Sequence, residues 1–561
     1  MTMDIAGLAL ACISQAVEIL RYFHGVIQDS KEFGEDVRQI TTRITTESAR
    51  LSAFREFLEN KNFADGKSRF EMLPEPHRLA VSGMVQELLI MFGTYTTILN
   101  KFDLRELQAG RAQFNSDKIA DGDMLAQKGR EASWELQQHT KLVDKAYWGF
   151  FKKKNILNIV AKLEEWNNKL QNFLLCGLCF LDETKLAVAS GSEEDRATLK
   201  TLRLTTGLRL RSIITGTGAS SIEILQQGYT LSPAQKDGKL RTLTTSDSTT
   251  KFYAEYKPYK PRRGSPQEPA EAMTKRVLRL GNLLCQPRAA DTGFHTLQCK
   301  FIVNEKVKVQ GRDSFRFAFL FSLPSQASGE EPIDLLSAIN PSSYTRPTLG
   351  ERFKIAKTLV DTVFQLHSVG WLHKSIRTEN IVFFPRRGSP GSQLELDYSQ
   401  QYMVGFEFSR DENDTSTTEQ DDVLERNIYR HPDRQGPPDT RFSVLHDIYS
   451  VGVVLLEVGL WRSVIDYDPD FPEMLAEDIK ETLEKHAEQR LPHYMGRAYT
   501  DATLACLRGS LDSSGNKTSG AITLNLERQR EAIQLAFHKQ VMGRIECGRS
   551  LIQADCGQVV F

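Results

Sequence analysis

The sequence has little charge imbalance, no long apolar run and no cluster of cysteines. Its 71 basic and 72 acidic residues leave a formal net charge of −1, so the chain as a whole offers no electrostatic attraction for nucleic acid. The uncharged run over residues 5–17 is shorter than the roughly 20 apolar residues that cross a bilayer as a helix. No basic segment precedes this run, so we expect no secretory signal and a cytoplasmic protein.

The eight cysteines are scattered, as is typical of reduced thiols in the cytosol. Cys176 and Cys179 form a single C-x-x-C pair. A structural zinc site normally has four ligands, and no second Cys/His pair accompanies this one. We therefore expect buried thiols on a helix, and no metal, at this pair.

A chain of 561 residues is too long for a single hydrophobic core. In its first third, apolar residues recur at three-and-four spacing, which predicts helices near 5–27, 37–58, 76–99, 123–150 and 153–183. Long amphipathic helices with polar connections predict an all-α antiparallel bundle over residues 1–190.

The pattern changes at the small and polar run over 189–195, which fits either a linker or the end of the last helix, and we place the linker over residues 191–204. Beyond it, β-type runs occur at 251–257, 297–303 and 316–321, and helical patterns dominate after residue 350. We therefore predict a multidomain fold, in which an α+β bilobal domain over 205–561 follows the bundle. Its small, strand-rich lobe covers about 205–335 and its helical lobe about 336–561, the order found in protein kinases.

The segment over 372–380 carries the main functional signal, because it resembles the protein-kinase catalytic loop H-R-D-L-x-x-x-N. His373 matches the loop histidine and Asn380 matches the asparagine that holds a magnesium ion in active kinases. Ser375 stands where the family has the aspartate that accepts the proton of the substrate hydroxyl. A serine hydroxyl near neutral pH cannot accept that proton as a carboxylate does, and a positioned base is worth about 10²–10⁴-fold in rate.

A second degenerate motif follows at the position of D-F-G, where this chain has Gly405, Phe406 and Glu407. Gly405 has no side-chain ligand for magnesium, and Glu407 places a carboxylate two residues late. The segment over 429–433 resembles the A-P-E segment that closes the activation loop. The segment over 446–452 resembles the D-x-x-S-x-G start of the large central helix, with Asp447 as its aspartate. The resemblance implies that Asp447 supports the backbone of the catalytic loop.

Lys257 is the candidate for the strand lysine that reaches nucleotide phosphates. No G-x-G-x-x-G precedes it, and Arg276 lies near the place where the family has a helix glutamate. We therefore predict a pseudokinase with no catalytic residue, no required cofactor and no metal site beyond Asn380 as a vestigial magnesium ligand. Binding of ATP without turnover is left open.

The segment over 410–422 stands where an activation loop would lie, and it is acidic and rich in hydroxyl groups. It fits a solvated loop. It equally fits a phosphorylation switch at Thr415, Ser416, Thr417 or Thr418, since a phosphate adds roughly −2 charge.

Residues 3–11 and the segment over 148–170 resemble the fungal HeLo domain, also called the prion-inhibition-and-propagation domain. The resemblance covers about 1–190 and implies a helical bundle that acts in heterokaryon incompatibility, a programmed cell death in which the N-terminal helix inserts into membrane. The apolar residues of that helix fit either a buried core helix or a conditional membrane segment. They are Ile5, Leu8, Leu10, Ile13 and Val17.

Together these features predict a cytoplasmic signalling or cell-death effector, membrane-associated on activation. Its partners would be other proteins or further copies of the chain, and membrane lipid through the N-terminal helix, with no nucleic acid. Two alternatives stay open: a protein-binding scaffold without membrane activity, and an atypical ATP-dependent kinase that uses Glu407 or another carboxylate.

Overall fold

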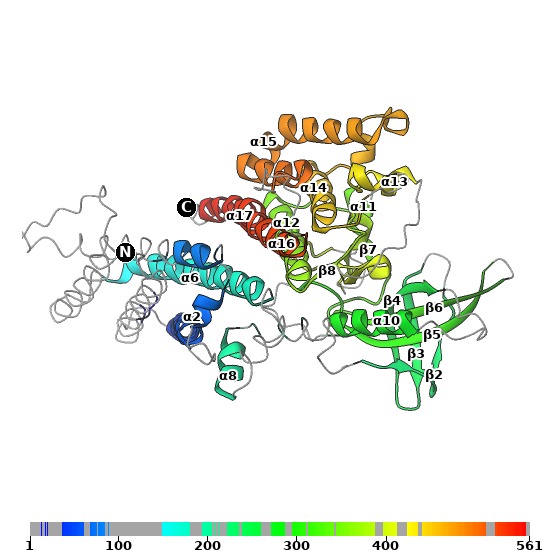
Figure 1. Ribbon diagram of the computed structural model, residues 1–561, viewed down its shortest axis with the longest axis horizontal. Helices are drawn as coiled ribbons and strands as arrows, with labels where there is room; N and C mark the ends of the chain where they lie inside the picture. Colours follow the sequence, from blue (N-terminus) through cyan, green and yellow to red (C-terminus); the bar gives the residue numbers. More distant parts are fainter. Residues whose placement is uncertain are drawn as a thin grey trace, which may run out of the picture. The chain divides into compact units, whose positions relative to one another are not determined.

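The structure, a computed structural model of the chain, divides into two compact units, Met1–Leu208 and Arg209–Phe561 (Figure 1). The residues that it describes are 13, 17, 20, 36–60, 68–73, 75, 77–84, 88, 148–179, 193–202, 204, 208, 211, 222–234, 238–259, 271–285, 294–309, 312–340, 344–386, 396–411, 423–435, 440–511 and 522–556.

The first unit is helical in its described part. Helices α2 (Asp36–Glu59) and α6 (Trp148–Cys179) pack side by side, and α3 (Arg69–Met72) and α8 (Glu193–Thr201) contact α2. The apolar stripe of α2 meets that of α6 in one buried cluster, which includes Phe54, Leu58, Leu163 and Leu170. The helices predicted over 37–58 and 153–183 are therefore confirmed, while most of 123–150 lies outside the described residues.

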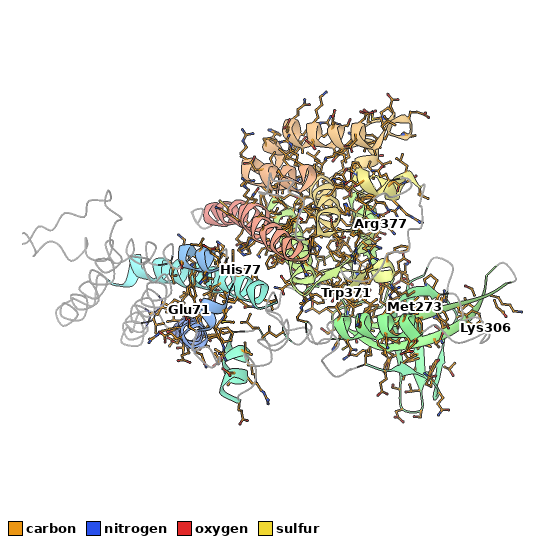
Figure 2. All side chains as sticks on the ribbon, in the orientation of Figure 1. Glu71, His77, Met273, Lys306, Trp371 and Arg377 are labelled. Atoms are coloured by element: carbon orange, nitrogen blue, oxygen red, sulfur yellow. The ribbon has the colours of Figure 1, made fainter. Side chains whose placement is uncertain are left out.

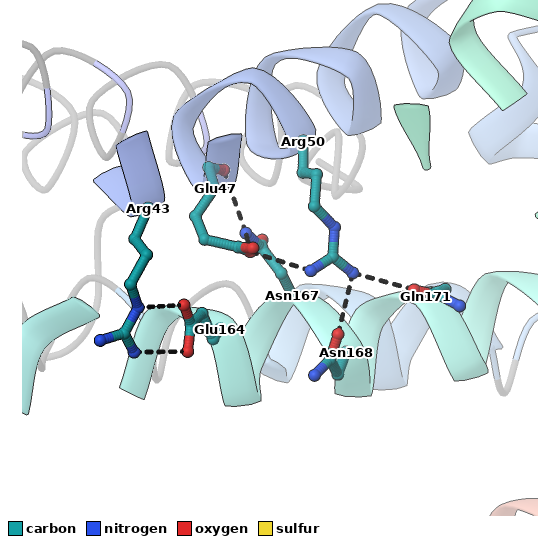
Figure 3. Close-up of polar contacts among 7 residues, drawn as sticks. All are labelled: Arg43, Glu47, Arg50, Glu164, Asn167, Asn168 and Gln171. Atoms are coloured by element: carbon teal, nitrogen blue, oxygen red, sulfur yellow. Dashed lines mark hydrogen bonds and ion pairs between the residues drawn. The ribbon is translucent and has the colours of Figure 1, made fainter. Parts of the chain in front are cut away.

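A row of polar contacts also joins α2 to α6 (Figure 3). Arg43 donates two hydrogen bonds of 2.8 Å to the carboxylate of Glu164. About two turns further on, the guanidinium of Arg50 is 2% exposed and donates to Glu47, Asn168 and Gln171 at 2.9, 3.0 and 2.8 Å. Because a buried charge is costly unless it is paired, these bonds fix how the two helices align.

Residues 193–201, within the predicted linker over 191–204, form helix α8, which contacts α2. Asp195 on α8 accepts a bond of 2.6 Å from Arg69 on α3, and both side chains are almost fully buried. The Arg69 guanidinium also lies 4.6 Å from the centre of the Phe57 ring. The segment looks polar in sequence because so few of its residues face the core, but Asp195 and Leu199 anchor it there.

The N-terminal apolar segment is described at three positions, all helical. Ile13, Val17 and Leu20 are 0%, 5% and 0% exposed and belong to the core of the first unit. The predicted membrane residues Ile5, Leu8 and Leu10 lie outside the described residues. Within the described part of the chain, no helix is long and apolar enough to cross a membrane.

The second unit begins with a six-stranded mixed sheet in the order β1-β5-β6-β4-β3-β2. All neighbours are antiparallel except β1 and β5. The strands are β1 (Ile224–Leu225), β2 (Tyr229–Leu231), β3 (Leu240–Thr245), β4 (Thr249–Tyr259), β5 (Cys299–Val309) and β6 (Arg312–Ser322). Helix α10 (Glu271–Leu284) follows β4 in the chain and contacts β5. The three β-type runs predicted from sequence correspond to β4, β5 and β6.

Helices dominate the rest of the second unit (Figure 1). Helix α12 (Leu349–Ser368) begins with a capping box between Thr348 and Glu351, and it packs on the almost entirely buried α14 (Val444–Leu460). Helix α15 (Ala476–Arg508) bends at Gly496, and α16 (Ile522–Phe537) and α17 (Gly543–Cys556) pack beside α12.

Short elements lie between these helices. They are β7 (Ile333–Asp334), α11 (Leu335–Ile339), β8 (Trp371–Leu372), β9 (Ile381–Phe383), β10 (Gln401–Met403), β11 (Arg410–Asp411) and α13 (Leu424–Asn427). Trp371, labelled in Figure 2, is 1% exposed and fixes the start of the loop that carries the degenerate motif. The chain is thus multidomain, with helices in the first unit and an α+β arrangement in the second.

Candidate functional site

The loop after β8 is held from inside the helical part of the unit. The buried carboxylate of Asp447, in the first turn of α14, accepts the backbone N–H groups of His373 and Lys374 at 2.8 Å each. It also lies 3.1 Å from Nε2 of His367. Burial alone would raise the pKa of Asp447, but these bonds and the nearby histidines outweigh it and lower that pKa. Asp447 therefore supports the loop backbone, as expected, including Lys374 in its left-handed conformation at φ +67°.

His373 is fully buried and neutral. Its Nδ1 accepts the N–H of Ser375 at 3.3 Å, which leaves Nε2 to donate to the carbonyl of Val404 at 3.1 Å. Its ring packs against Phe406, with the centroids 4.6 Å apart. Burial lowers the pKa of His373 to about 4, so it stays uncharged at neutral pH. His373 therefore ties the loop to the segment that contains Gly405.

Asn380 and Gly405 meet where the kinase resemblance would place the metal. Asn380 ends the short 3₁₀ helix η3 (Thr378–Asn380), and its Nδ2 donates to the carbonyl and hydroxyl oxygens of Ser375 at 2.7 and 3.1 Å. Gly405 has φ +83°, and a Cβ atom there would lie 2.5 Å from Oδ1 of Asn380. The Asn380 amide thus fills the space next to Gly405, and a side chain at 405 needs that amide to move.

Lys257 on β4 points to this same segment, but it reaches backbone oxygens there. Its Nζ donates to the carbonyl of Glu407 and lies 3.4 Å from that of Ser409. Glu271, an acidic residue at the start of α10, pairs with Lys275 on its own helix at 2.7 Å. The predicted nucleotide lysine is therefore engaged by its own chain in this structure.

Glu255 is a site residue that the sequence analysis missed. Its buried carboxylate accepts the N–H groups of Gly405 and Phe406 at 2.6 and 3.0 Å. Burial raises the pKa of Glu255, although the two backbone bonds work against this effect. The sequence could have indicated Glu255, because residues two apart on a strand face the same side. Glu255 is two residues before Lys257, which was already a candidate.

A group of cations lies beside the loop. Burial, together with the nearby charges of Arg410 and Arg434, lowers the pKa of Lys374 to about 8. Lys374 also lies 5.4 Å from the centre of the Phe442 ring. The segment over 412–422 comes next in sequence after β11, and its predicted phosphorylation residues Thr415, Ser416, Thr417 and Thr418 lie outside the described residues.

The chemistry available here is limited. Ser375 and Gly405 supply no carboxylate. Glu407 contacts Lys257 through its backbone oxygen, which accepts a hydrogen bond from Nζ. Asn380 has its Nδ2 committed to Ser375, so Oδ1 is the atom it would offer to a cation. The arrangement joins β4, the 373–380 loop and the 404–409 segment into one hydrogen-bonded cluster.

Comparison with protein families gives a match for part of the first unit. Residues 5–185 match the HeLo family model, described as prion-inhibition and propagation. The match falls within the first unit and confirms the HeLo part of the resemblance. A comparison with curated proteins finds no match. The α2–α6 contacts and the Arg69–Asp195 pair are thus features of a region with HeLo character, although Asp195 itself lies beyond the matched residues.

Proposed function

We propose that this protein is a signalling effector in which a HeLo region executes a cell-death or prion-inhibition response under the control of a catalytically inactive, kinase-like domain. The HeLo match carries the proposal, because it connects residues 5–185 with prion inhibition and propagation. The order of a sheet-rich segment and then a helical segment in the second unit supports the kinase-like assignment.

The cluster around Gly405 supports the absence of phosphoryl transfer. That chemistry depends on positioning and on charge neutralisation by metal ions. Here Lys257 binds backbone oxygens and the Asn380 amide fills the space beside Gly405. Both the base position and one metal-ligand position lack a carboxylate, so two defects act together.

Membrane engagement by the N-terminal segment must be conditional. Ile13, Val17 and Leu20 are buried in the core of the HeLo region. Exposing three such side chains to water costs roughly 5–9 kcal/mol, at about 1.5–3 kcal/mol each. Contacts with lipid or with another copy of the chain must offset this free-energy cost. The release of this segment therefore needs a trigger.

A phosphate on the 412–422 segment is one trigger that the charges favour. Lys374, Arg410 and Arg434 lie near one another, and the charges of the two arginines help to lower the Lys374 pKa. A phosphate carries about −1.5 to −2 charge at neutral pH and would gain from such a group. Thr415 to Thr418 supply the hydroxyls.

The decisive experiment measures leakage of dye from anionic vesicles by the full chain and by a variant that lacks residues 1–27. We expect leakage from the full chain to disappear in the deletion variant, and circular dichroism to show that the remaining helices persist. Equal leakage from both proteins would refute the membrane role and favour the scaffold.

The inactive assignment has its own test. We expect no transfer of the ATP γ-phosphate to a peptide substrate by the full chain with magnesium, and none by the Lys257→Ala variant. Transfer by the full chain that the Lys257→Ala change abolishes would establish the atypical kinase instead.

A further inference from the structure

Three potential metal ligands converge where residues 431–434 meet the first turn of α14. His431 precedes the 3₁₀ helix η5 (Pro432–Arg434), which contains Asp433, and His446 lies on α14. One ligand atom from each residue lies within 4.8 Å of the others. Nδ1 of His431 and Oδ2 of Asp433 are 3.4 Å apart. This separation is close to the roughly 3.4 Å expected between two ligands that bind one tetrahedral zinc ion at about 2.0–2.1 Å.

The two imidazole rings are already fixed in place. His431 packs edge-on against Tyr449 with centroids 5.3 Å apart, and His446 packs against Phe442 at 5.0 Å. The two imidazole centroids are themselves 5.4 Å apart. Rings held by packing lose little rotational freedom when they bind a ligand, which favours tight binding.

Nδ1 of His431 faces the carboxylate of Asp433. A neutral His431 places a nitrogen lone pair opposite a carboxylate oxygen of Asp433, an arrangement that a cation between them would stabilise. The backbone N–H of Asp433 also donates to Nδ1 of His431, at 3.3 Å. This hydrogen bond is long and therefore weak, so a metal ion at Nδ1 could replace it.

The charged residues around His431 and His446 have opposing effects on a bound cation. Arg434 and Lys480 lie near enough to disfavour a positive ion, and Glu477 favours one. Arg434 is directed elsewhere, because it donates to the carbonyl of Thr440 and lies 5.7 Å from the centre of the Phe442 ring.

His446 must also exchange a bond to coordinate a metal. Its Nδ1 accepts the N–H of Ser443 at 2.9 Å, so a neutral ring carries its proton on Nε2. Coordination through Nε2 moves that proton to Nδ1 and ends the Ser443 bond. This exchange lowers the affinity, and it couples metal binding to the start of α14.

We propose that His431, Asp433 and His446 form a binding site for a divalent cation of the zinc class. Two imidazoles and one carboxylate suit zinc and its first-row neighbours. Three protein ligands leave a remaining position for water or a further ligand. A bound ion would clamp η5 to α14 across residues 436–439, in the segment that follows the proposed phosphorylation loop.

The test is a titration of the chelator-treated full chain with Zn²⁺ by calorimetry, repeated with Co²⁺ by visible absorption. The variants are Asp433→Asn and His431→Gln, whose side chains are partly exposed, and the matched control is the exposed Asp478→Asn on α15. We expect one Zn²⁺ equivalent to bind to wild type and control. Each site variant should lose affinity by at least about tenfold, the lower end of what the loss of even an outer partner costs.

Co²⁺ should give the intense visible bands of a four-coordinate site in wild type, and these bands should weaken in Asp433→Asn. Thermal unfolding without metal checks that the variants are folded. If wild type binds no Zn²⁺, or if both site variants bind it as wild type does, the proposal is wrong.

Discussion

Replacing Gly405 with alanine should destabilise the second unit by more than the change of backbone conformation alone. Gly405 has φ +83°, and a left-handed conformation costs a residue with a Cβ atom about 1–2 kcal/mol. The new methyl group would also lie 2.5 Å from Oδ1 of Asn380, well inside contact distance. Overpacking of this kind costs about 1–3 kcal/mol, so the free energy of unfolding should fall by about 2–5 kcal/mol.

Gly228 provides the matched control. It has nearly the same φ, +80°, but a Cβ atom there would meet nothing within 4 Å. The change Gly228→Ala should therefore cost only the backbone contribution of about 1–2 kcal/mol. Urea unfolding of the full chain, followed by circular dichroism, measures both variants under the same conditions.

A double-mutant cycle then isolates the Asn380 contact. In an Asn380→Ala background the space beside position 405 is empty, so Gly405→Ala should cost no more than Gly228→Ala. The coupling between the two changes should be about 1–3 kcal/mol. An equal cost of Gly405→Ala in both backgrounds, or a cost no larger than that of Gly228→Ala, would refute the reasoning.

Three further predictions concern buried charged groups. Burial raises the pKa of Glu457 to about 7, above its ordinary value of 4.5, so its stabilising contribution is complete below pH 4.5 and is lost as the pH rises to 7. Over that window the stability of Glu457→Gln relative to wild type should rise by about 2–4 kcal/mol in urea unfolding, and a pH-independent difference would contradict this. Asp195→Ala leaves the Arg69 guanidinium buried without its carboxylate and should cost about 3–5 kcal/mol in thermal unfolding, whereas the exposed Glu193→Ala should cost little. Asp447→Asn turns an N–H group toward backbone donors and should lower the free energy of unfolding by about 1–3 kcal/mol, measured as a lower urea midpoint at unchanged slope.

Local patterns in the sequence were enough to predict two long helices of the first unit and three strands of the second. The short β-type run around Phe252 and Tyr253 predicted β4, because aromatic residues favour strands. The spacing of Ile40, Ile44 and Leu51 predicted α2, because burial of one helix face imposes that period. Helix α8 was missed for the same reason, since a helix that buries few apolar residues has a weak period. Its attachment depends on Asp195, and a polar anchor leaves no periodic signal.

The candidate site was predictable only as a set of positions. The motifs located Ser375, Asn380 and Gly405, but the bond from Gly405 to Glu255 joins residues 150 apart in sequence. No local pattern encodes a pairing of that separation. It depends on how β4 and the 404–409 segment come together, and that arrangement follows from packing of the whole unit.

The two degenerate positions, Ser375 and Gly405, are not independent of each other. The Asn380 amide donates to Ser375 and fills the space beside Gly405, so a single side-chain orientation connects all three. A carboxylate at 375 could accept the same bond from Asn380, because a carboxylate oxygen is at least as good an acceptor as the serine hydroxyl. A carboxylate at 405 cannot be added until the amide turns away and gives up its bonds to Ser375. The metal-ligand position is therefore the harder of the two to restore, and in the proposed inactive domain it is Gly405, more than Ser375, that fixes the loop in its present form.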